Sequence, residues 1–365
     1  MIVNNKHFRS IWFDKKVNEV RIIDQRYLPY EFKVITVESL SDFETAIKDM
    51  AVRGAPLIGA TAAYGLALQT QRDPSDKSIL EACEVLNTTR PTAINLSWAL
   101  NKCKIELLAM EPSKRPSIAM DLAHKISNDD VETNRKIGLH GLEKIKSIAK
   151  KKDHYGPLNI LTHCNAGWLA TVDWGTATSP MYHAHEANIP IHVWVDETRP
   201  RNQGALTSWE LGSHGISHNY ITDNAGGHLM QSGAVDLVIV GTDRTTANGD
   251  VCNKIGTYLK ALAAKDNGIP FYVALPSSTI DWSISDGVGQ IPIEERPEKE
   301  VSLIQGMSKL GEVSEVKVTP DGSIGSNPAF DVTPARLVSG LITERGICEA
   351  SSEGLLHLFP EKRSH

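Results

Sequence analysis

The sequence is poor in cysteine and lacks long apolar stretches. Its 365 residues include five cysteines, an odd number, and no two are spaced as Cys-x-x-Cys, which argues against a disulfide framework or a structural zinc site. The first six residues are too polar for the apolar part of a secretory signal. No run of residues approaches the apolar length that spans a bilayer. We therefore expect a cytoplasmic protein that does not enter a membrane.

Several cofactor motifs are also missing. The sequence contains no G-x-G-x-x-G, no G-x-x-x-x-G-K-[ST] and no G-x-S-x-G, so dinucleotide, P-loop and serine-hydrolase sites lose their main support. Histidines at 163, 183, 185 and 192 do not follow a zinc spacing, and the Asp- and Asn-rich segment 243–254 lacks the ligand spacing of a calcium loop. The pattern therefore favours scattered structural histidines over a metal site.

The charge and length limit the partners and the organisation of the chain. The formal net charge is -6, which argues against a nucleic-acid surface and means that any bound phosphate needs cations gathered in one pocket. A chain of this length exceeds the size of a single core, so we expect two domains. The prediction is a helical N-terminal domain with a small sheet over residues 1–125, and a catalytic domain over residues 126–365.

The periodicity of apolar residues predicts an α/β fold. Alternation within 11–37 indicates a small antiparallel sheet, and helical spacing follows at 40–50, 57–68, 78–88, 92–110 and 129–151. Short apolar runs then alternate with helical segments, at 159–161, 191–195, 220–221, 237–240 and 271–274. This alternation predicts a mostly parallel, Rossmann-like sheet covered on both faces. Polar residues directly follow the first four runs. They should meet at the carboxyl edge of the sheet, where such sheets bind ligands.

Three segments are candidates for phosphate binding. Arg53-Gly54-Ala55-Pro56 precedes a predicted helix, where glycine permits close approach and the helix offers free N–H groups. Asn253-Lys254 stands before a predicted helix at 255–264, where a lysine is unfavourable unless an anion is near. Arg90 precedes another helix. Each also fits a plain structural role, as a surface arginine, a solvated lysine or a loop arginine.

Two residues are candidates for acid–base chemistry. Cys164 lies just past a predicted strand in a turn of small residues, where neighbouring cations and N–H groups can lower the pKa of a thiol. Asp243 follows the apolar run 237–240, and a carboxyl group in a dry crevice can have a raised pKa and donate a proton. The plainer alternatives are a buried, inert cysteine and an aspartate that caps a helix.

At these motifs the sequence resembles the 5-methylthioribose-1-phosphate isomerases, in the superfamily shared with the α, β and δ subunits of the eukaryotic translation-initiation exchange factor. The similarity covers nearly the whole chain, and several motifs in the same order make it specific. They are Ile23-Asp24-Gln25-Arg26-Tyr27-Leu28-Pro29, Val52-Arg53-Gly54-Ala55-Pro56, Arg90-Pro91-Thr92-Ala93-Ile94-Asn95-Leu96, Thr162-His163-Cys164-Asn165-Ala166-Gly167, Asp196-Glu197-Thr198-Arg199-Pro200, Gly241-Thr242-Asp243-Arg244, Asn253-Lys254-Ile255-Gly256 and Asn327-Pro328-Ala329-Phe330-Asp331-Val332-Thr333-Pro334.

The resemblance implies an aldose–ketose isomerase of methionine salvage that acts on a small sugar phosphate. It also implies a homodimer with a helical N-terminal domain and a Rossmann-like C-terminal domain, and no metal or organic cofactor. Asp243 would be the proton donor and Cys164 the second catalytic group. The implied substrate contacts are Arg53, Gly54, Ala55, Arg90, Gln203, Asn253 and Lys254.

Several alternatives stay open at this point. Related isomerases act on 5-deoxyribose 1-phosphate or ribose 1,5-bisphosphate, and one apolar pocket separates the first of these only weakly from the methylthio sugar. A non-catalytic subunit that binds a sugar phosphate is another class. Cys164 could act as a thiolate base or assist a hydride shift, and Asp223, Arg199 and Arg244 could be structural or contact substrate.

Overall fold

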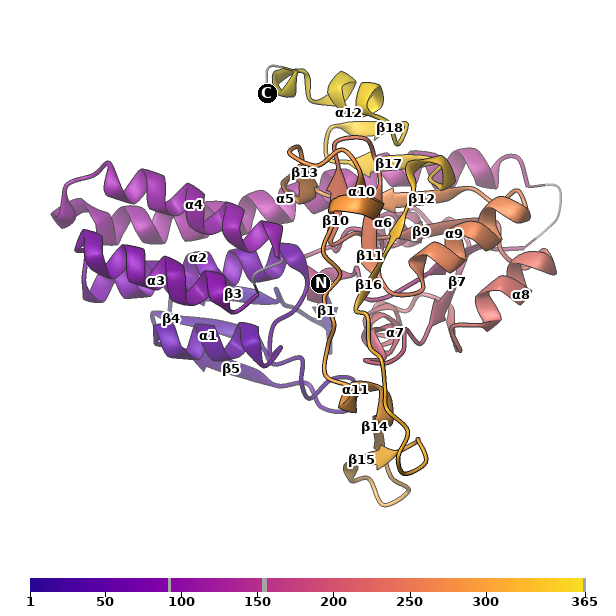
Figure 1. Cartoon of the computed structure of the whole chain (residues 1–365), viewed down its shortest axis with the longest axis horizontal. Helices are drawn as coiled ribbons and strands as arrows, with labels where there is room; N and C mark the ends of the chain where they lie inside the picture. Colours follow the sequence, from indigo (N-terminus) through magenta and orange to yellow (C-terminus); the bar gives the residue numbers. More distant parts are fainter. Residues whose placement is uncertain (91–92, 153–155, 364–365) are drawn as a thin grey trace.

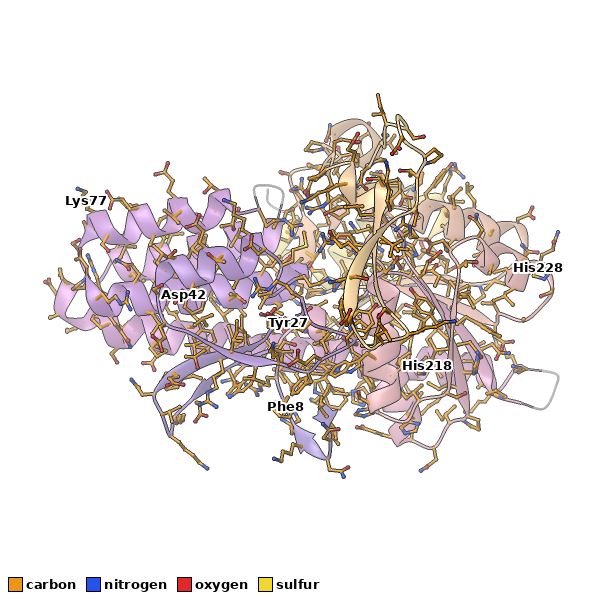
Figure 2. The ribbon with its side chains drawn as sticks, turned by 90° about the horizontal axis from the view of Figure 1, so that it is seen from below. Phe8, Tyr27, Asp42, Lys77, His218 and His228 are labelled. Carbon is orange, nitrogen blue, oxygen red and sulfur yellow. The ribbon has the colours of Figure 1, made fainter. Side chains whose placement is uncertain are left out.

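The computed structural model describes residues 1–90, 93–152 and 156–363, so Pro91 and Thr92 of the predicted motif and helix lie outside the described residues. The helices of the N-terminal part lie at one side of the molecule and the large sheet with its helices at the other (Figure 1). Asp42 and Lys77 mark the first part, and His218 and His228 lie at the opposite end (Figure 2). The predicted fold class is confirmed by this arrangement.

The small antiparallel sheet forms where the alternation predicts it. Its strands are β3 (Ile11–Asp14), β4 (Glu19–Ile23) and β5 (Val34–Val37), paired in that order, and a short hairpin of β1 (Ile2–Val3) and β2 (Lys6–His7) precedes them. In β4, Val20 and Ile22 enter the core of the helical part, whereas Ile23 joins the core beneath the large sheet. One strand therefore contributes to both cores.

Five helices build the N-terminal part around α2. Their bounds are α1 (Leu40–Lys48), α2 (Ala55–Arg72), α3 (Asp76–Thr88), α4 (Ile94–Leu108) and α5 (Arg115–Ala149). The α2 helix is rich in Gly and Ala and buried on nearly all sides, because small side chains let α4 and α5 approach it closely. This burial fixes the position of the α2 N-terminus, which carries the predicted anion-binding turn.

The α5 helix connects the two parts of the molecule. It starts earlier than the helix expected at 129–151 and packs against both α2 and α6 (Ser179–Glu186). The predicted boundary between residues 125 and 126 falls inside this continuous helix. The division of the chain there stays a prediction.

A seven-stranded sheet forms the centre of the C-terminal part. Its order is β18-β17-β12-β9-β6-β7-β8, and only the edge pair β17–β18 is antiparallel. The bounds are β6 (Leu158–Thr162), β7 (Ile191–Asp196), β8 (His218–Ile221), β9 (Leu237–Val240), β12 (Phe271–Ala274), β17 (Gly340–Thr343) and β18 (Gly346–Cys348). From β6 the chain adds strands toward β8, and from β9 it adds them in the other direction. The strand order therefore reverses between β6 and β9.

Both faces of this sheet are covered, as the apolar runs predict. Successive residues of β9 alternate between two cores, with Leu237 and Ile239 in one and Val238 and Val240 in the other. Residues of α5, α6 and α7 (Gln203–Ser213) fill the first core. Residues of α8 (Ala225–Gln231), α9 (Thr257–Asp266) and α12 (Ser352–Leu358) fill the second.

Several elements have no counterpart in the sequence prediction. A four-stranded sheet has the order β13-β10-β11-β16, and a hairpin of β14 and β15 extends away from the rest of the chain (Figure 1). The bounds are β10 (Arg244–Thr246), β11 (Val251–Lys254), β13 (Ile280–Asp281), β14 (Leu303–Met307), β15 (Val313–Lys317) and β16 (Phe330–Thr333). The short helices are η1 (Pro112–Lys114), η2 (Trp168–Ala170), η3 (Ser277–Thr279), α10 (Gly287–Gln290), α11 (Lys299–Ser302), η4 (Ala335–Leu337) and η5 (Pro360–Lys362).

The second sheet corrects one step of the sequence argument. Asn253 and Lys254 end strand β11, and the following helix α9 begins only at Thr257. Lys254 is therefore held by a strand, and the argument from an unfavourable lysine at a helix start does not apply. Among the described helices, none is both long enough and apolar enough to cross a lipid bilayer.

The contact between α5 and α6 leaves no room for a side chain at Gly138. A Cβ atom there would lie 2.1 Å from Ser179 Oγ and 2.4 Å from His183 Cδ2. We expect Gly138→Ala to lower the free energy of unfolding by about 1–3 kcal/mol, because neighbouring atoms must shift. Urea unfolding followed by circular dichroism measures this. Gly227→Ala in α8, where the nearest atom is 3.9 Å away, is the matched control and should be neutral or slightly stabilising. Equal midpoints for the two variants would contradict the packing argument.

Candidate functional site

The two candidate acid–base residues follow the two central strands of the large sheet. Cys164 comes two residues after β6, and Asp243 comes three residues after β9. These strands pair in parallel, Ile160 with Leu237 and Leu161 with Val238. Because the strand order reverses between them, the loops after β6 and β9 diverge and leave a crevice at their carboxyl ends. The topology thus brings a thiol and a carboxyl group to one crevice.

All nine predicted site residues line one cavity in that crevice, here called the inner pocket. It has a free volume of about 80 Å³. Its walls include Arg53, Gly54, Ala55, Arg90, Cys164, Gln203, Asp243, Asn253 and Lys254. The N-terminal part contributes the first four and the Rossmann-like part the other five, so the pocket needs both parts of the chain.

The turn at Arg53 and Gly54 has the geometry of an anion site. Gly54 is the N-cap of α2 and has a φ of 94°, and a Cβ there would lie 2.4 Å from the carbonyl oxygen of Ala170. Only glycine fits this backbone and this close contact. The first N–H groups of the 18-residue helix α2 have no partner within the helix and carry its positive dipole. Arg53 adds a guanidinium, whose Nη1 donates to Asn165 Oδ1 at 2.8 Å.

Lys254 brings a second cation to the same pocket from β11. Its side chain is 8% exposed, and its ammonium lies 4.4 Å from the centre of the Phe330 ring. Burial lowers the pKa of Lys254, and the nearby Cys164 and Asp243 oppose that shift. The neighbouring Asn253 is buried, and its Nδ2 donates to Thr257 Oγ1 at 3.0 Å. Burying a cation here costs free energy unless an anion joins it, which suits a phosphate site.

The thiol of Cys164 does not have the lowered pKa that the sequence predicts. Burial raises the pKa of Cys164, and the charges of Arg53 and Lys254, although they act in the expected direction, do not overcome it. The nearby cations are visible in the sequence, whereas the desolvation that raises the thiol pKa depends on the whole fold. The raised pKa favours the neutral thiol of Cys164 over the thiolate.

The carboxyl group of Asp243 behaves as expected. Burial raises its pKa above the ordinary value, while Lys254, Arg90 and Arg53 lower it to a smaller extent. Its backbone N–H donates to the carbonyl oxygen of Cys252 at 3.0 Å, which fixes the loop after β9. A carboxyl group that stays protonated to higher pH can serve as a proton donor.

Sequence reasoning missed two arginines of the inner pocket, Arg201 and Arg296. Both pair with Glu300, at 2.6 Å for Arg201 Nη1 and 2.7 Å for Arg296 Nη2. Arg296 also pairs with Glu294 at 2.9 Å, which lies 3.9 Å from Arg90. The two arginines hold the pKa of Glu300 at about 2 although burial acts to raise it. Arg201 could have been suspected from its place just after the polar motif at 196–200, but no local pattern marks Arg296.

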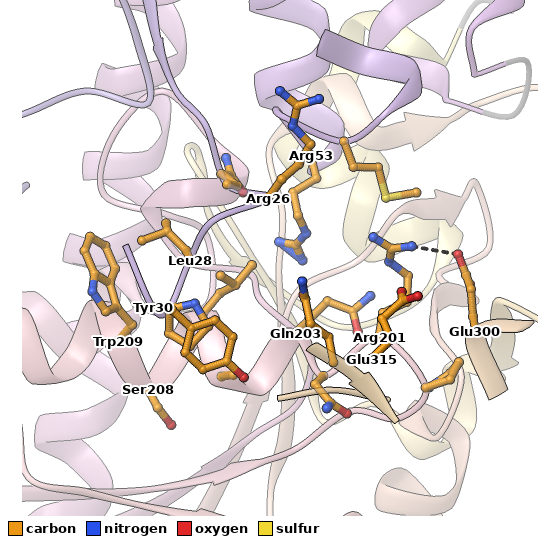
Figure 3. Close-up of a pocket in the computed structure, with 18 of the residues that line it drawn as sticks. Arg26, Leu28, Tyr30, Arg53, Arg201, Gln203, Ser208, Trp209, Glu300 and Glu315 are labelled. Carbon is orange, nitrogen blue, oxygen red and sulfur yellow. Dashed lines mark hydrogen bonds and ion pairs between the residues drawn. The ribbon is translucent and has the colours of Figure 1, made fainter. Parts of the chain in front are cut away.

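A wider cavity of about 790 Å³, here called the outer cavity, adjoins the inner pocket. The two share Met50, Arg53, Arg201 and Gln203 as lining residues. Figure 3 shows the Arg201–Glu300 pair on one side of this cavity and Tyr30 and Trp209 on the other. Its size is within the range of small-molecule sites, so the outer cavity is large enough to hold a small molecule beside the inner pocket.

A buried ion-pair network supports the Cys164 loop from below. The N–H of Cys164 donates to Thr198 Oγ1 at 2.8 Å, and that hydroxyl donates to Asp196 Oδ1 at 3.0 Å. Asp196 also contacts His163 Nδ1 at 2.8 Å and Lys260 Nζ at 3.1 Å. Cys164 and Thr198 have φ values of 67° and 58°, which residues other than glycine rarely adopt. The network holds the thiol in this unusual backbone conformation.

The same network contains the one grouping of possible metal ligands found among the described residues, His163, Asp196 and Asp223. The ammonium of Lys260 already pairs with both carboxylates, and His163 Nε2 faces the carbonyl oxygen of Ile255 at 2.9 Å. Its donors are therefore engaged with one another. That the chain uses no metal remains a prediction.

The three residues left open by the sequence have structural contacts. Asp223 accepts hydrogen bonds from the N–H groups of Thr198 and Arg199, each at 2.8 Å. The guanidinium of Arg199 donates to the carbonyl oxygen of Val301, and Arg244 lies 3.6 Å from Asp281. The inner pocket is lined by none of these three.

The comparisons with known proteins give consistent relatives. The model of the initiation factor 2 subunit family matches residues 51–350. The methylthioribose-1-phosphate isomerase of Cereibacter sphaeroides is 63% identical over 362 residues, covering 99% of this chain and 98% of that protein. The Escherichia coli protein of that name is 58% identical, covering 100% and 98%.

Solved structures extend the similarity to the fold. The 5-methylthioribose 1-phosphate isomerase of Pyrococcus horikoshii matches with a TM-score of 0.83 and 40% identity, covering 98% of this chain and 97% of that one. A structure described as subunit delta of translation initiation factor eIF-2B from A. fulgidus matches with a TM-score of 0.80 and 38% identity, covering 97% and 100%.

The electrostatics of Cys164 lead to a direct test. We expect Lys254→Met to raise the pKa of the thiol further, because it removes a cation that favours the thiolate. The pH dependence of iodoacetamide labelling at Cys164, followed by mass spectrometry, measures this pKa. Lys265→Met, which removes an exposed lysine from α9, is the control and should leave it unchanged. A lowered or unchanged thiol pKa in Lys254→Met would contradict the assignment.

Proposed function

Because the chain belongs to the initiation factor 2 subunit family and, within it, to the methylthioribose-1-phosphate isomerases, we propose that it converts 5-methylthioribose 1-phosphate to 5-methylthioribulose 1-phosphate in methionine salvage. The observation that carries this proposal is the inner pocket. A carboxyl group with a raised pKa and a thiol face one crevice that Arg53, Lys254 and the α2 N-terminus make positive.

The substrate needs an acid because its phosphate blocks the anomeric oxygen. Ordinary hemiacetal opening is then unavailable, and the bond between C1 and the ring oxygen must break with a proton delivered to that oxygen. Asp243 is the donor in this proposal, since its raised pKa favours the protonated form. Arg53, Gly54 and Lys254 bind the phosphate, and Gln203 contacts the sugar.

Hydrogen then moves from C2 to C1. The raised pKa of Cys164 favours a direct shift of hydride to the electron-poor C1, with the thiol polarising the reacting centre, over proton removal by a thiolate. As C2 becomes a carbonyl, its hydroxyl proton returns to the Asp243 carboxylate. The acid is thereby restored, and atoms and charge balance without a further reactant.

The charges of the pocket favour a sugar with an uncharged 5-substituent. A bisphosphate needs a second set of cations, and the two additional arginines of the pocket, Arg201 and Arg296, are already paired with Glu300 and Glu294. This pairing argues against ribose 1,5-bisphosphate. It does not separate a methylthio from a deoxy sugar, because an apolar pocket discriminates such groups by only roughly 1–3 kcal/mol.

We also propose that the protein is cytoplasmic. The five cysteines are free thiols, as a reducing cytoplasm requires. We propose a homodimer on the family resemblance. Light scattering coupled to size-exclusion chromatography would measure the assembled mass.

The proposed activity is tested by assaying the purified protein on three sugars in parallel. We expect turnover of 5-methylthioribose 1-phosphate, with kcat/KM for 5-deoxyribose 1-phosphate within about 10–200-fold of it and far lower for ribose 1,5-bisphosphate. Tight binding of a pentose 1-phosphate without turnover would instead favour a regulatory protein.

Asp243→Asn separates catalysis from stability. We expect kcat to fall by about 10²–10⁴-fold, because the proton donor is lost. The folded-state pKa of Asp243 is raised, so above that pKa its ionisation costs folding free energy, whereas below the ordinary pKa this cost is absent. The amide avoids the cost, and the Tm at pH 8 should be equal or higher. Asp266→Asn, at the exposed end of α9, is the control for both measurements. A lower Tm with normal turnover would refute the assignment.

The path of the hydrogen is tested in deuterium oxide. A hydride shift predicts product without deuterium at C1, measured by mass spectrometry or NMR after a single turnover, because the C2 hydrogen never exchanges with solvent. Deuterium at C1 would assign Cys164 to proton transfer as a thiolate. Cys164→Ser, which keeps a polar hydroxyl, should retain more activity than Cys164→Ala if the thiol polarises the centre.

A further inference from the structure

A buried glutamate on α7 is connected to the anion-binding turn without lining the inner pocket. Gln203, the first residue of α7, reaches the pocket, and Glu210 lies seven residues later on the same side of the helix. Glu210 is 1% exposed, so its carboxylate sits within the protein. A buried carboxylate is costly unless its oxygens accept hydrogen bonds, and its partners therefore show what it holds in place.

The first contact leads through Asn165 to Arg53. Asn165 Nδ2 donates to Glu210 Oε1 at 3.0 Å and to Thr207 Oγ1 at 3.1 Å. With its NH₂ group directed at two acceptors, the amide must present its oxygen on the other side. That oxygen accepts from Arg53 Nη1 at 2.8 Å. The carboxylate thus determines the orientation of the amide that holds the guanidinium.

The second contact leads through η2 to Gly54. The N–H of Leu169 donates to Glu210 Oε1 at 2.8 Å, and the next residue, Ala170, packs directly against Gly54. A Cβ on Gly167 would lie 1.6 Å from Glu210 Oε2, so the backbone closes tightly over the carboxylate. The side chain of Glu210 therefore supports both the guanidinium of Arg53, through Asn165, and the backbone at Gly54, through η2.

The hydrogen bond from Tyr182 to Glu210 allows a positioning role to be told apart from a contribution to stability alone. Tyr182 donates from its hydroxyl to Glu210 Oε2 at 3.2 Å, away from Asn165 and Leu169, which both bind Oε1. Burial raises the pKa of Glu210 to about 7, while the hydrogen bonds from Asn165, Leu169 and Tyr182 favour the charged form. Oε1 therefore binds the groups that lead to the anion-binding turn, whereas Oε2 binds Tyr182. A change at Tyr182 can test the second contact separately from the first.

We propose that Glu210 is a positioning residue for phosphate binding, acting through Asn165 on Arg53 and through η2 on Gly54. The proposal rests on the proposed function only in taking the inner pocket as a phosphate site. It predicts that changes at Glu210 act on affinity for the phosphate group more than on the chemical step.

The test measures the Kd of inorganic phosphate by calorimetry for the full chain. Glu210→Met, which removes both acceptors, should weaken binding by about tenfold. Glu210→Gln, which keeps an acceptor oxygen but loses the charge, should weaken it by only about two- to threefold. Where substrate turns over, KM should rise with the Kd while kcat changes little, the pattern of lost uniform binding. Tyr182→Phe is the matched control, and it should lower the Tm without changing the phosphate Kd.

A double-mutant cycle shows whether Glu210 acts through Arg53. In an Arg53→Met background the effect of Glu210→Met on the phosphate Kd should shrink from about tenfold to about threefold or less, and the effect of Glu210→Gln should disappear, because the group being positioned is gone. Equal effects in both backgrounds, or wild-type affinity in both Glu210 variants, would overturn the proposal. Should Glu210→Met fail to fold, Glu210→Gln alone decides. Phosphate affinities that follow this pattern in a protein without isomerase activity would refute the proposed function and support this inference.

Discussion

The parallel pairing of β6 with β9 is the constraint on which the site depends. These two strands are far apart in the sequence, yet their ladder sets Cys164 and Asp243 at neighbouring positions on one edge of the sheet. Every other part of the site is arranged around that pair. The α2 N-terminus approaches from the helical part, and β11 brings Lys254 from the second sheet. A shift of the ladder by one residue would turn side chains to the wrong face.

Charge is distributed unevenly around this pair. A chain with a net charge of -6 places Arg53, Arg90, Lys254, Arg201 and Arg296 around one pocket. Glu294 and Glu300 pair with the three arginines on one side, and the buried Glu210 reaches Arg53 through a neutral amide. Direct pairing would occupy the guanidinium, whereas an intervening amide holds it and leaves it able to bind an anion. The pocket therefore keeps its positive charge where the phosphate is proposed to bind.

Sequence patterns predict those features that depend on neighbouring residues. The buried strand runs, the polar residues after them and the Arg53-Gly54 turn are all local, and the structure brings the nine predicted site residues together. The second sheet was missed because β10 and β11 are short and their outer partners, β13 and β16, lie far along the chain. Arg296 was missed for the same reason. The pKa of Cys164 was predicted in the wrong direction because burial is set by the whole fold, whereas the nearby cations are visible in the motifs.

The continuous α5 helix has a mechanical consequence. The 35-residue helix α5 packs on α2 at one end and on α6 at the other. It therefore forms a rigid connection between the two parts of the chain that line the pocket. Hinge motion of one part against the other would have to bend α5. Its glycines, Gly138 and Gly141, are in close contact with α6, which leaves no space for such bending. The segment from Glu294 to Lys317 carries the counterions of Arg90, Arg201 and Arg296 and ends in the β14–β15 hairpin, which extends away from the rest of the chain (Figure 1). A rearrangement of this segment would therefore change the charge of the pocket without bending α5.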